Sequence, residues 1–205
     1  VLGSESTAQI ARGAGVPEDQ IVVVSGTTSF EFGKFQVTLR PSSHVPIGWR
    51  GSVPLDGVIE EPLKPPQPIT AWRMGGAFTV TLEHPQGTVL VQGSAGYDKY
   101  LLRDVSADVV FLSVAQLAWL GERYAELYWQ HTVTATGSRR VFPIHFDDYT
   151  RPFGTVDLPP RMINNLGTIA EWFDAFRLRW DRDAELFMPQ FGKPIAIFSQ
   201  AGEET

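Results

Sequence analysis

The sequence predicts a mixed α/β (α+β) fold. Two pairs of short alternating segments, within residues 30–39 and 77–92, have the pattern of β-hairpins. Further along, an apolar strand, an amphipathic helix and a second apolar strand follow one another between residues 107 and 144, which is the order of an α/β crossover. The chain has 205 residues, of which 43% are hydrophobic, so it can bury the core of one domain, with or without an appendage.

The N-terminal third begins with a short helix over residues 4–14 and a buried strand at residues 21–24. A hairpin follows over residues 30–39 around Gly33 and Lys34, because glycine in first place suits a two-residue turn. Residues 45–68 are rich in proline and glycine and lack periodicity. They indicate a long surface loop, which either covers a site or is a tolerated insertion.

The remaining elements alternate between strands and helices. The helices are predicted from apolar residues at helical spacing, and the strands from short apolar or alternating runs. The expected strands cover residues 77–83, 88–92, 107–113, 141–144 and 193–198, and the expected helices cover 117–136 and 159–176. The second helix places Ile169, Phe173 and Phe176 on one core-facing side.

Charge and composition exclude several classes of protein. The net charge of −6 and the pI of about 5.2 argue against nucleic acid or an anionic membrane as a partner. The absence of cysteine excludes disulfides, thiolate metal sites and a cysteine nucleophile. No apolar run reaches the roughly 18 residues of a membrane span, and no signal peptide is visible, so we expect a soluble protein of unassigned compartment.

The segment from Arg139 to Tyr149 carries the densest group of chemically active residues. Its apolar run ends at His145, and Asp147 and Asp148 follow at once. A buried strand that delivers a histidine and then acids to the rim of a sheet can hold a metal ion or a general base. The same residues also fit a strand that ends in a polar loop with one ordinary histidine, and the sequence alone does not separate these interpretations.

His44 has the same placement as His145, just past the end of an expected strand. If the two strands are neighbours, both imidazoles meet at one edge of the sheet. The other two histidines are explained without a site: His84 lies in a hairpin turn, and His131 lies at the end of the long helix, where a cation is favourable. Zinc takes three or four ligands, so two histidines make an incomplete site. The nearest acidic candidates are Asp98, Asp147 and Asp148.

Small residues follow the second hairpin, from Gly93 to Tyr97. They permit close backbone approach to a ligand, a metal site or a neighbouring strand. The chain has no H-E-x-x-H, P-loop, G-x-S-x-G or G-x-G-x-x-G motif. The residue types of a Ser-His-Asp triad are present, among them Ser43, Ser94 and His145, but without the strained turn that exposes a catalytic serine.

Four strings, in a fixed order, resemble the second half of the metallo-β-lactamase superfamily of hydrolases, nearest its lactonase-like and uncharacterised members. The string from Gly33 to His44 looks like the strand that brings the third-motif histidine, and that from Thr88 to Tyr97 looks like the strand that normally ends in the metal-bridging aspartate. The other two strings are residues 107–113 with the helix after them, which look like the next crossover, and residues 141–148, which look like the strand ending in the last metal histidine.

The resemblance covers residues 1–153. It implies a metallo-β-lactamase-like αββα sandwich, of which this chain forms the second half. Residues 154–205 would then be a C-terminal helical extension with a final strand and a tail.

The chain departs from the family pattern at two places. The first metal motif, H-x-H-x-D-H, is absent and is expected upstream of Val1, because the chain begins as though in mid-domain. Ser94 stands where the bridging aspartate is expected, and a serine hydroxyl is a poor bridging ligand. This departure favours one metal ion over two, or Asp147 or Asp148 as a substitute ligand.

The resemblance also implies a function. His44 and His145 would bind a divalent metal, zinc by preference, and metal-activated water would attack an ester, lactone, amide or phosphoester in a small-molecule substrate. Asp147 and Asp148 would be the catalytic carboxylates. The substrate pocket would be shaped by the 45–68 loop and by Ser94, Trp49 and Trp72.

Two other hypotheses remain open. One is a non-catalytic relative that keeps the fold as a binding or structural module without a complete metal site. The other is an unrelated α/β binding domain without a metal. Whether the sandwich is a hydrolase or a non-catalytic relative, half of this fold alone would expose an apolar sheet face. We therefore expect the missing N-terminal half as a companion segment or chain, or a homo-oligomer.

Overall fold

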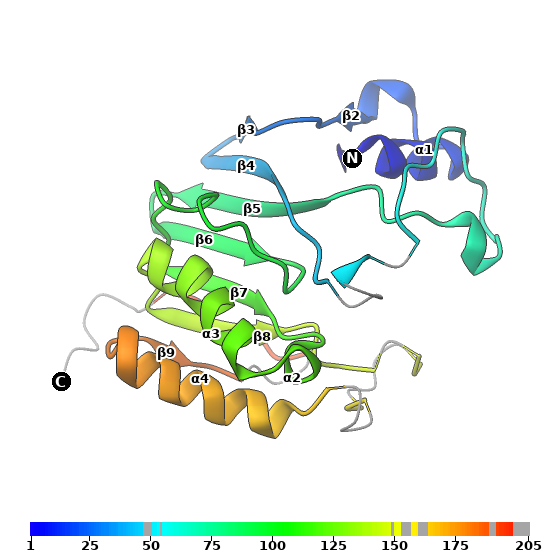
Figure 1. The fold of residues 1–205 in the computed structure, drawn as a ribbon. Coiled ribbons are helices and arrows are strands. Elements are labelled where there is room, and N and C mark those ends of the chain that lie inside the picture. Colours follow the sequence, from blue (N-terminus) through cyan, green and yellow to red (C-terminus); the bar gives the residue numbers. More distant parts are fainter. Residues whose placement is uncertain are drawn as a thin grey trace.

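The computed structural model of the chain describes residues 1–46, 51–53, 55–148, 150–152, 157–159, 164–188 and 192–198. Its main feature is one seven-stranded mixed sheet with the strand order β3-β4-β5-β6-β7-β8-β9 (Figure 1). The strands are β1 (Leu2–Gly3), β2 (Val22–Val23), β3 (Thr28–Phe32), β4 (Phe35–Ser42), β5 (Ala77–His84), β6 (Gly87–Gln92), β7 (Val109–Ser113), β8 (Arg140–Ile144) and β9 (Glu185–Leu186). The helices are α1 (Glu5–Gly13), α2 (Leu117–Leu120), α3 (Glu122–Trp129) and α4 (Leu166–Trp180).

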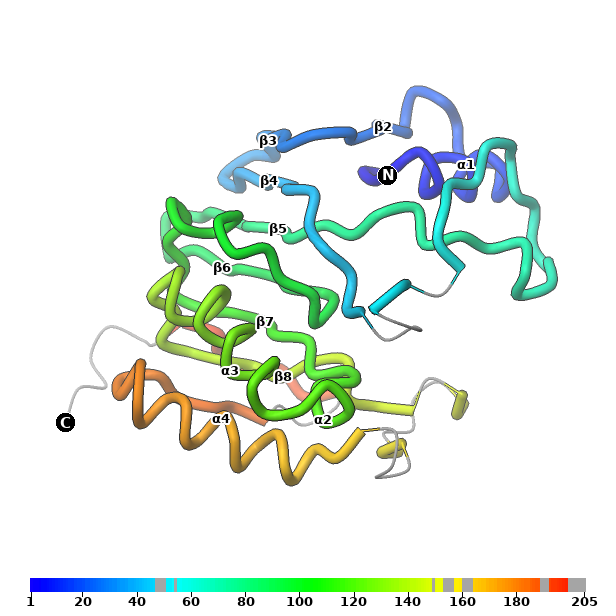
Figure 2. Tube along the Cα trace, in the orientation of Figure 1, coloured from blue at the N-terminus to red at the C-terminus, as the bar shows by residue number. Residues whose placement is uncertain are grey.

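The direction of the strands decides which loops meet. Strands β3 to β6 are antiparallel, with the two-residue turn of the first hairpin between Phe32 and Phe35, and β6 to β9 are parallel. Strands β4, β6, β7 and β8 therefore run in the same direction, and their carboxyl ends lie at one edge of the sheet. The tube in Figure 2 follows the chain to this edge, where ligand sites of open α/β sheets commonly lie.

Helices α2, α3 and α4 cover one face of the sheet at the β7–β9 side (Figure 1). Apolar side chains alternate along the strands, so that Leu90, Val110 and Val141 point to these helices, where Trp129 and Phe173 are fully buried against them. Burying one such large side chain contributes about 1.5–3 kcal/mol. The expected core-facing side of the second helix, with Ile169, Phe173 and Phe176, is confirmed.

The opposite face of the sheet has a smaller apolar cluster built on Val89, Val109 and Phe142. Phe187 stacks on Phe142 with 5.0 Å between ring centroids, and the final described residues add further apolar contacts to the same face. The prediction of a strand at residues 193–198 is wrong, because the described residues 192–198 contain no strand. Phe198 of this segment packs on the face of the sheet, and the segment does not pair with an edge strand.

Three further boundaries differ from the sequence prediction. The strand expected to be buried at residues 21–24 is reduced to β2, whose Val22 and Val23 are each 41% exposed, because β1 and β2 pair outside the large sheet. The long helix breaks at Gly121, where φ is +87°, and ends in a π-helical turn at Gln130–Thr134. The last helix begins at Leu166, capped by Asn165, and not at Pro159. Pro160 lies outside the described residues.

The predicted mixed α/β class is confirmed. The described residues supply one large sheet with one helix layer, and α1 packs apart from it, against the segment 55–76 (Figure 1). The predicted boundary near residue 153 stays a prediction; beyond it, α4 joins the main core and β9 joins the main sheet. No helix in the described part of the chain is long and apolar enough to cross a membrane.

Candidate functional site

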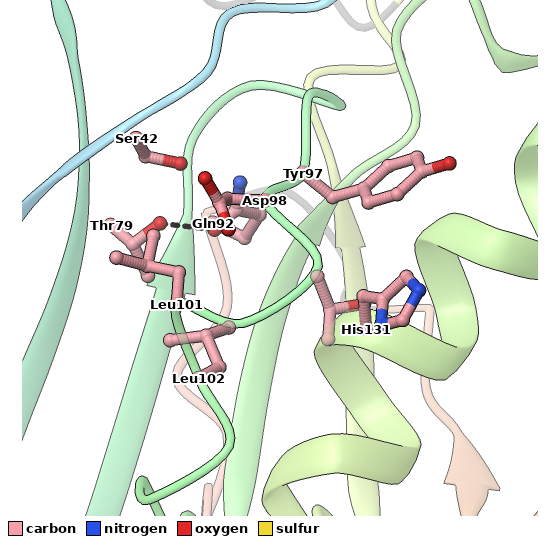
Figure 3. A pocket seen from close by; sticks show the side chains of 9 residues that line it. Ser42, Thr79, Gln92, Tyr97, Asp98, Leu101, Leu102 and His131 are labelled. Atoms are coloured by element: carbon pink, nitrogen blue, oxygen red, sulfur yellow. Dashed lines mark hydrogen bonds between the residues drawn. The ribbon is translucent and has the colours of Figure 1, made fainter.

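The candidate site is organised around the loop that follows β6. Gln92, the last residue of that strand, is only 2% exposed. Its Nε2 donates to the carbonyl oxygens of Ser94, at 3.1 Å, and Gly96, at 2.8 Å, while its Oε1 accepts from Thr79 Oγ1 at 2.5 Å (Figure 3). A buried amide that uses both ends in this way fixes the course of the loop.

The end of β4 lies directly on this loop. Ser94 Oγ accepts a hydrogen bond from the main-chain N–H of Val45 at 2.9 Å. A Cβ atom on Gly96 would overlap the main-chain carbonyls of Ser43 and His44, so only glycine allows the two backbones to approach this closely. The close approach predicted for the small-residue segment is therefore confirmed, and its partner is the segment that carries His44.

An open hollow of about 830 Å³ lies beside His44. It is lined by the end of β4, by Met74 and by the segment after the β6 loop. Tyr97 and Tyr124 form one wall, with 5.3 Å between their ring centroids. Tyr124 is held in place by its hydroxyl, which donates to the carbonyl oxygen of Ala95 at 3.0 Å.

His131 lies behind this wall, where the π-helical turn places its ring against Tyr97 with 5.3 Å between centroids (Figure 3). Burial lowers the pKa of His131, the nearby ammonium of Lys99 lowers it further, and Asp98 opposes both effects. His131 lies in the last helical turn, as expected, but its charged form is disfavoured because the stacked ring is partly withdrawn from water and Lys99 repels that form.

The two histidines expected to bind metal follow strands that are not neighbours, since β5, β6 and β7 lie between β4 and β8. His44 is half-buried, with Nδ1 3.0 Å from the carbonyl oxygen of Val45. His145 is exposed, has a left-handed backbone with φ of +57°, and lies with Nδ1 3.4 Å from Ser113 Oγ.

The two candidate carboxylates have different surroundings. Asp147 is exposed and has no hydrogen-bond or ion-pair partner among the described residues. Asp148 accepts from the hydroxyl of Thr150 at 2.6 Å and from its N–H at 3.0 Å, and it lies 3.5 Å from Arg151. The hydrogen bonds from Thr150, with a smaller contribution from Arg151, lower the pKa of Asp148, so this carboxylate accepts a proton less readily than an ordinary aspartate.

The residues expected to shape the pocket are spread out. Ser94 holds the segment after β4 by accepting the N–H of Val45. Trp72 is half-buried, with its indole nitrogen 3.4 Å from the carbonyl oxygen of Gln67. Neither lines the hollow beside His44. Trp49 lies outside the described residues. The assigned roles of these residues, and those of His44, His145, Asp147 and Asp148, stay predictions.

A zinc-type metal does not fit the donors that this part of the chain brings together. Within the described residues no three His, Asp or Glu side chains converge on one point, and three is the smallest protein ligand set of a catalytic zinc. Ser94, at the position of the expected bridging ligand, already accepts the N–H of Val45. A metal at this edge would need ligands from outside the described residues.

Several residues of the site were not singled out from the sequence. Gln92 gave a signal, since it is a polar residue at the end of an otherwise apolar strand. Tyr124 shared the spacing of the core-facing side of its helix, and nothing marked it as a pocket wall. Tyr97 and Lys99 lie in a loop whose course cannot be read from periodicity.

Comparison with known proteins leaves the family open. No protein-family model matches the chain, and no curated protein matches it. Among solved structures, 19 chains match. One is a Parabacteroides distasonis protein provisionally named a metal-dependent hydrolase, which is 12% identical with a TM-score of 0.49 over 91% of this chain. The chain spans 62% of the length of that protein, and likeness at this level assigns neither a family nor an activity.

Proposed function

We propose that this chain forms the substrate-binding part of a hydrolase that acts on a small molecule. The observation that carries the proposal is the hollow of about 830 Å³ beside His44, at the edge where the carboxyl ends of β4, β6, β7 and β8 lie. A concave site with aromatic walls and a few polar groups at this edge is the usual setting of an active site in an open α/β sheet. The scissile bond would be an ester, lactone, amide or phosphoester, as the resemblance to metallo-β-lactamases implies.

Asp147 is the carboxylate best suited to accept a proton, because it has no partner among the described residues, whereas Asp148 is held by Thr150. Membership of the metallo-β-lactamase superfamily and a divalent metal, zinc by preference, belong to the same proposal. They require metal ligands beyond the described residues.

The second candidate function is a non-catalytic binding module. It is favoured because the described residues supply no set of three metal ligands, and two histidines that follow separated strands do not hold a metal firmly. The two candidates share the hollow and differ in turnover.

Turnover and metal content of the purified protein separate the two candidates. We would assay ester, lactone, amide and phosphoester substrates after adding zinc, manganese or iron, and determine bound metal by elemental analysis. For the hydrolase, His44→Ala and His145→Ala each lower kcat/KM by more than about 100-fold, the usual cost of losing a group that takes part in acid–base or metal chemistry. The matched control is His84→Ala. His84 packs on Phe35 at the carboxyl end of β5, away from the carboxyl end of β4, and its loss is expected to leave the rate unchanged. No turnover of any of these substrates, with or without added metal, would leave the binding module. Hydrolysis that survives both substitutions would keep a hydrolase and refute the roles assigned to His44 and His145.

A further inference from the structure

The hollow beside His44 has an uneven distribution of charge. Among the described residues that line it, two carry a formal charge, Asp98 and Lys99. Asp98 is engaged by its own loop, because its Oδ1 accepts the N–H of Tyr100 at 2.9 Å. Lys99 has no carboxylate within ion-pair distance in the described part of the chain, and its Nζ lies 5.4 Å from the ring centroid of Tyr100. The hollow therefore offers one ammonium group that makes no ion pair with a described residue.

A second cation lies on the same tyrosine. The guanidinium of Arg103 sits over the Tyr100 ring, 4.6 Å from its centroid. Lys99 and Arg103 thus place two cations around Tyr100, beside the one carboxylate of Asp98, in a chain whose net charge is −6. An acidic protein repels anions in general, so a pair of cations beside one hollow favours an anionic group at that place.

The field of Lys99 also reaches the inner side of the aromatic wall. Burial lowers the pKa of His131, which stacks on the face of Tyr97; the ammonium of Lys99 lowers it further, and Asp98 opposes both effects. Lys99 therefore lies close enough to act on the Tyr97 side of the hollow as well as toward solvent.

The walls of the hollow suit an apolar body. Tyr97 and Tyr124 present ring surface, and Met74 adds a flexible thioether that adapts to irregular shapes. Tyr124 is fixed by its bond to Ala95, so this surface is preorganised. Aromatic walls with one cation at the rim fit a flat molecule that carries one negative group.

We propose that the hollow binds a small organic carboxylate, with the carboxylate at Lys99 and a flat apolar body against Tyr97 and Tyr124. The proposal rests on the proposed function for its biological meaning, since hydrolysis of an ester, lactone or amide releases a carboxylate. The binding itself requires neither turnover nor a metal.

The test is an NMR titration of the full chain, passed over a chelating resin to remove metal, with phenylacetate and its neutral counterpart phenylacetamide. Phenylacetate should shift the amide signals of residues 95–100 in a saturable way. Phenylacetamide should bind about tenfold more weakly, because a charge-assisted hydrogen bond is typically worth that factor or more.

Variants assign the effect to Lys99. Lys99→Met should reduce phenylacetate affinity to the level of phenylacetamide, and Lys99→Arg should retain most of it. The control Lys34→Met removes the same charge from the remote turn of the first hairpin and should change nothing. Unchanged unfolding midpoints would show that the variants are folded.

Three results would overturn the proposal: equal affinity for the acid and the amide, full affinity in Lys99→Met, or no saturable shift with either probe. A chain that binds phenylacetate through Lys99 but hydrolyses nothing would retain the carboxylate site and refute the hydrolase. A chain that hydrolyses neutral substrates without binding phenylacetate would support the hydrolase and refute the carboxylate site.

Discussion

Replacing Gln92 by leucine tests whether this buried amide holds the candidate site together. The substitution keeps approximately the same volume and removes three hydrogen bonds. The carbonyl oxygen of Gly96 and the hydroxyl of Thr79 are buried and would lose their partner, whereas Ser94 is only half-buried, so its carbonyl can turn to water. Leaving these two buried groups without a hydrogen-bond partner costs about 1–3 kcal/mol each, which gives a loss of about 2–6 kcal/mol in the free energy of unfolding.

The added apolar surface of leucine offsets part of this loss, so we expect about 3 kcal/mol. For a chain of this size that corresponds to a fall in Tm of roughly 6–12 °C. The assay is urea and thermal unfolding followed by tryptophan fluorescence and circular dichroism. Thr79→Val leaves only the side-chain carbonyl oxygen of Gln92 without a donor, so it should lower the free energy of unfolding by about half as much. Gln36→Leu on the exposed side of β4 should stay within about 0.5 kcal/mol. A cost below about 1 kcal/mol for Gln92→Leu, or one equal to that of Gln36→Leu, would refute the reasoning.

The other predictions concern the same edge. Gly96→Ala should separate the β4 segment from the β6 loop and weaken ligand binding in the hollow as well as stability, measured by the same NMR titration and urea unfolding. Ser94→Ala should leave the N–H of buried Val45 without its acceptor and cost about 1–2 kcal/mol in urea unfolding. The pKa of His131 should lie below 6.5 in an NMR pH titration and should rise in Lys99→Met. Because the unfolded chain binds this proton more readily, the stability linked to His131 is complete above pH 6.5 and falls as the pH drops from 6.5 toward the folded-state pKa; a flat stability curve in that window would contradict the assignment.

Local signals were sufficient for most of the sheet. Both hairpins were predicted because their turns and alternating residues leave few alternatives, and the buried side of α4 followed from the spacing of Ile169, Phe173 and Phe176. The break at Gly121 was not predicted, since the apolar spacing continues across it and only the backbone angle reveals it. The segment after β9 was mistaken for a strand because an apolar run looks alike whether it pairs at an edge or lies across a face.

The site was harder to predict than the fold because it depends on long-range geometry. Its edge of the sheet was expected from the strand ends, and the small residues around Gly96 indicated close backbone approach. The path of the chain after β4 decides that His44 lies against the β6 loop, and no periodicity encodes that path. The contact of His131 with Tyr97 depends on a π-helical turn, a backbone form without a sequence signature of its own.

Positioning and recognition reside in different residues of this edge, and the difference can be measured. Gln92, Ser94 and Gly96 fix where the β4 segment and the β6 loop lie, so their substitution lowers stability and ligand affinity together. Lys99 is exposed and makes no ion pair in the described part of the chain, so above pH 6.5 its loss should lower affinity with little change in the free energy of unfolding. A plot of affinity against unfolding free energy should place the three positioning variants on one trend and Lys99→Met well below it. If Lys99→Met fell on that trend, the cation would be acting through the fold and not on a ligand.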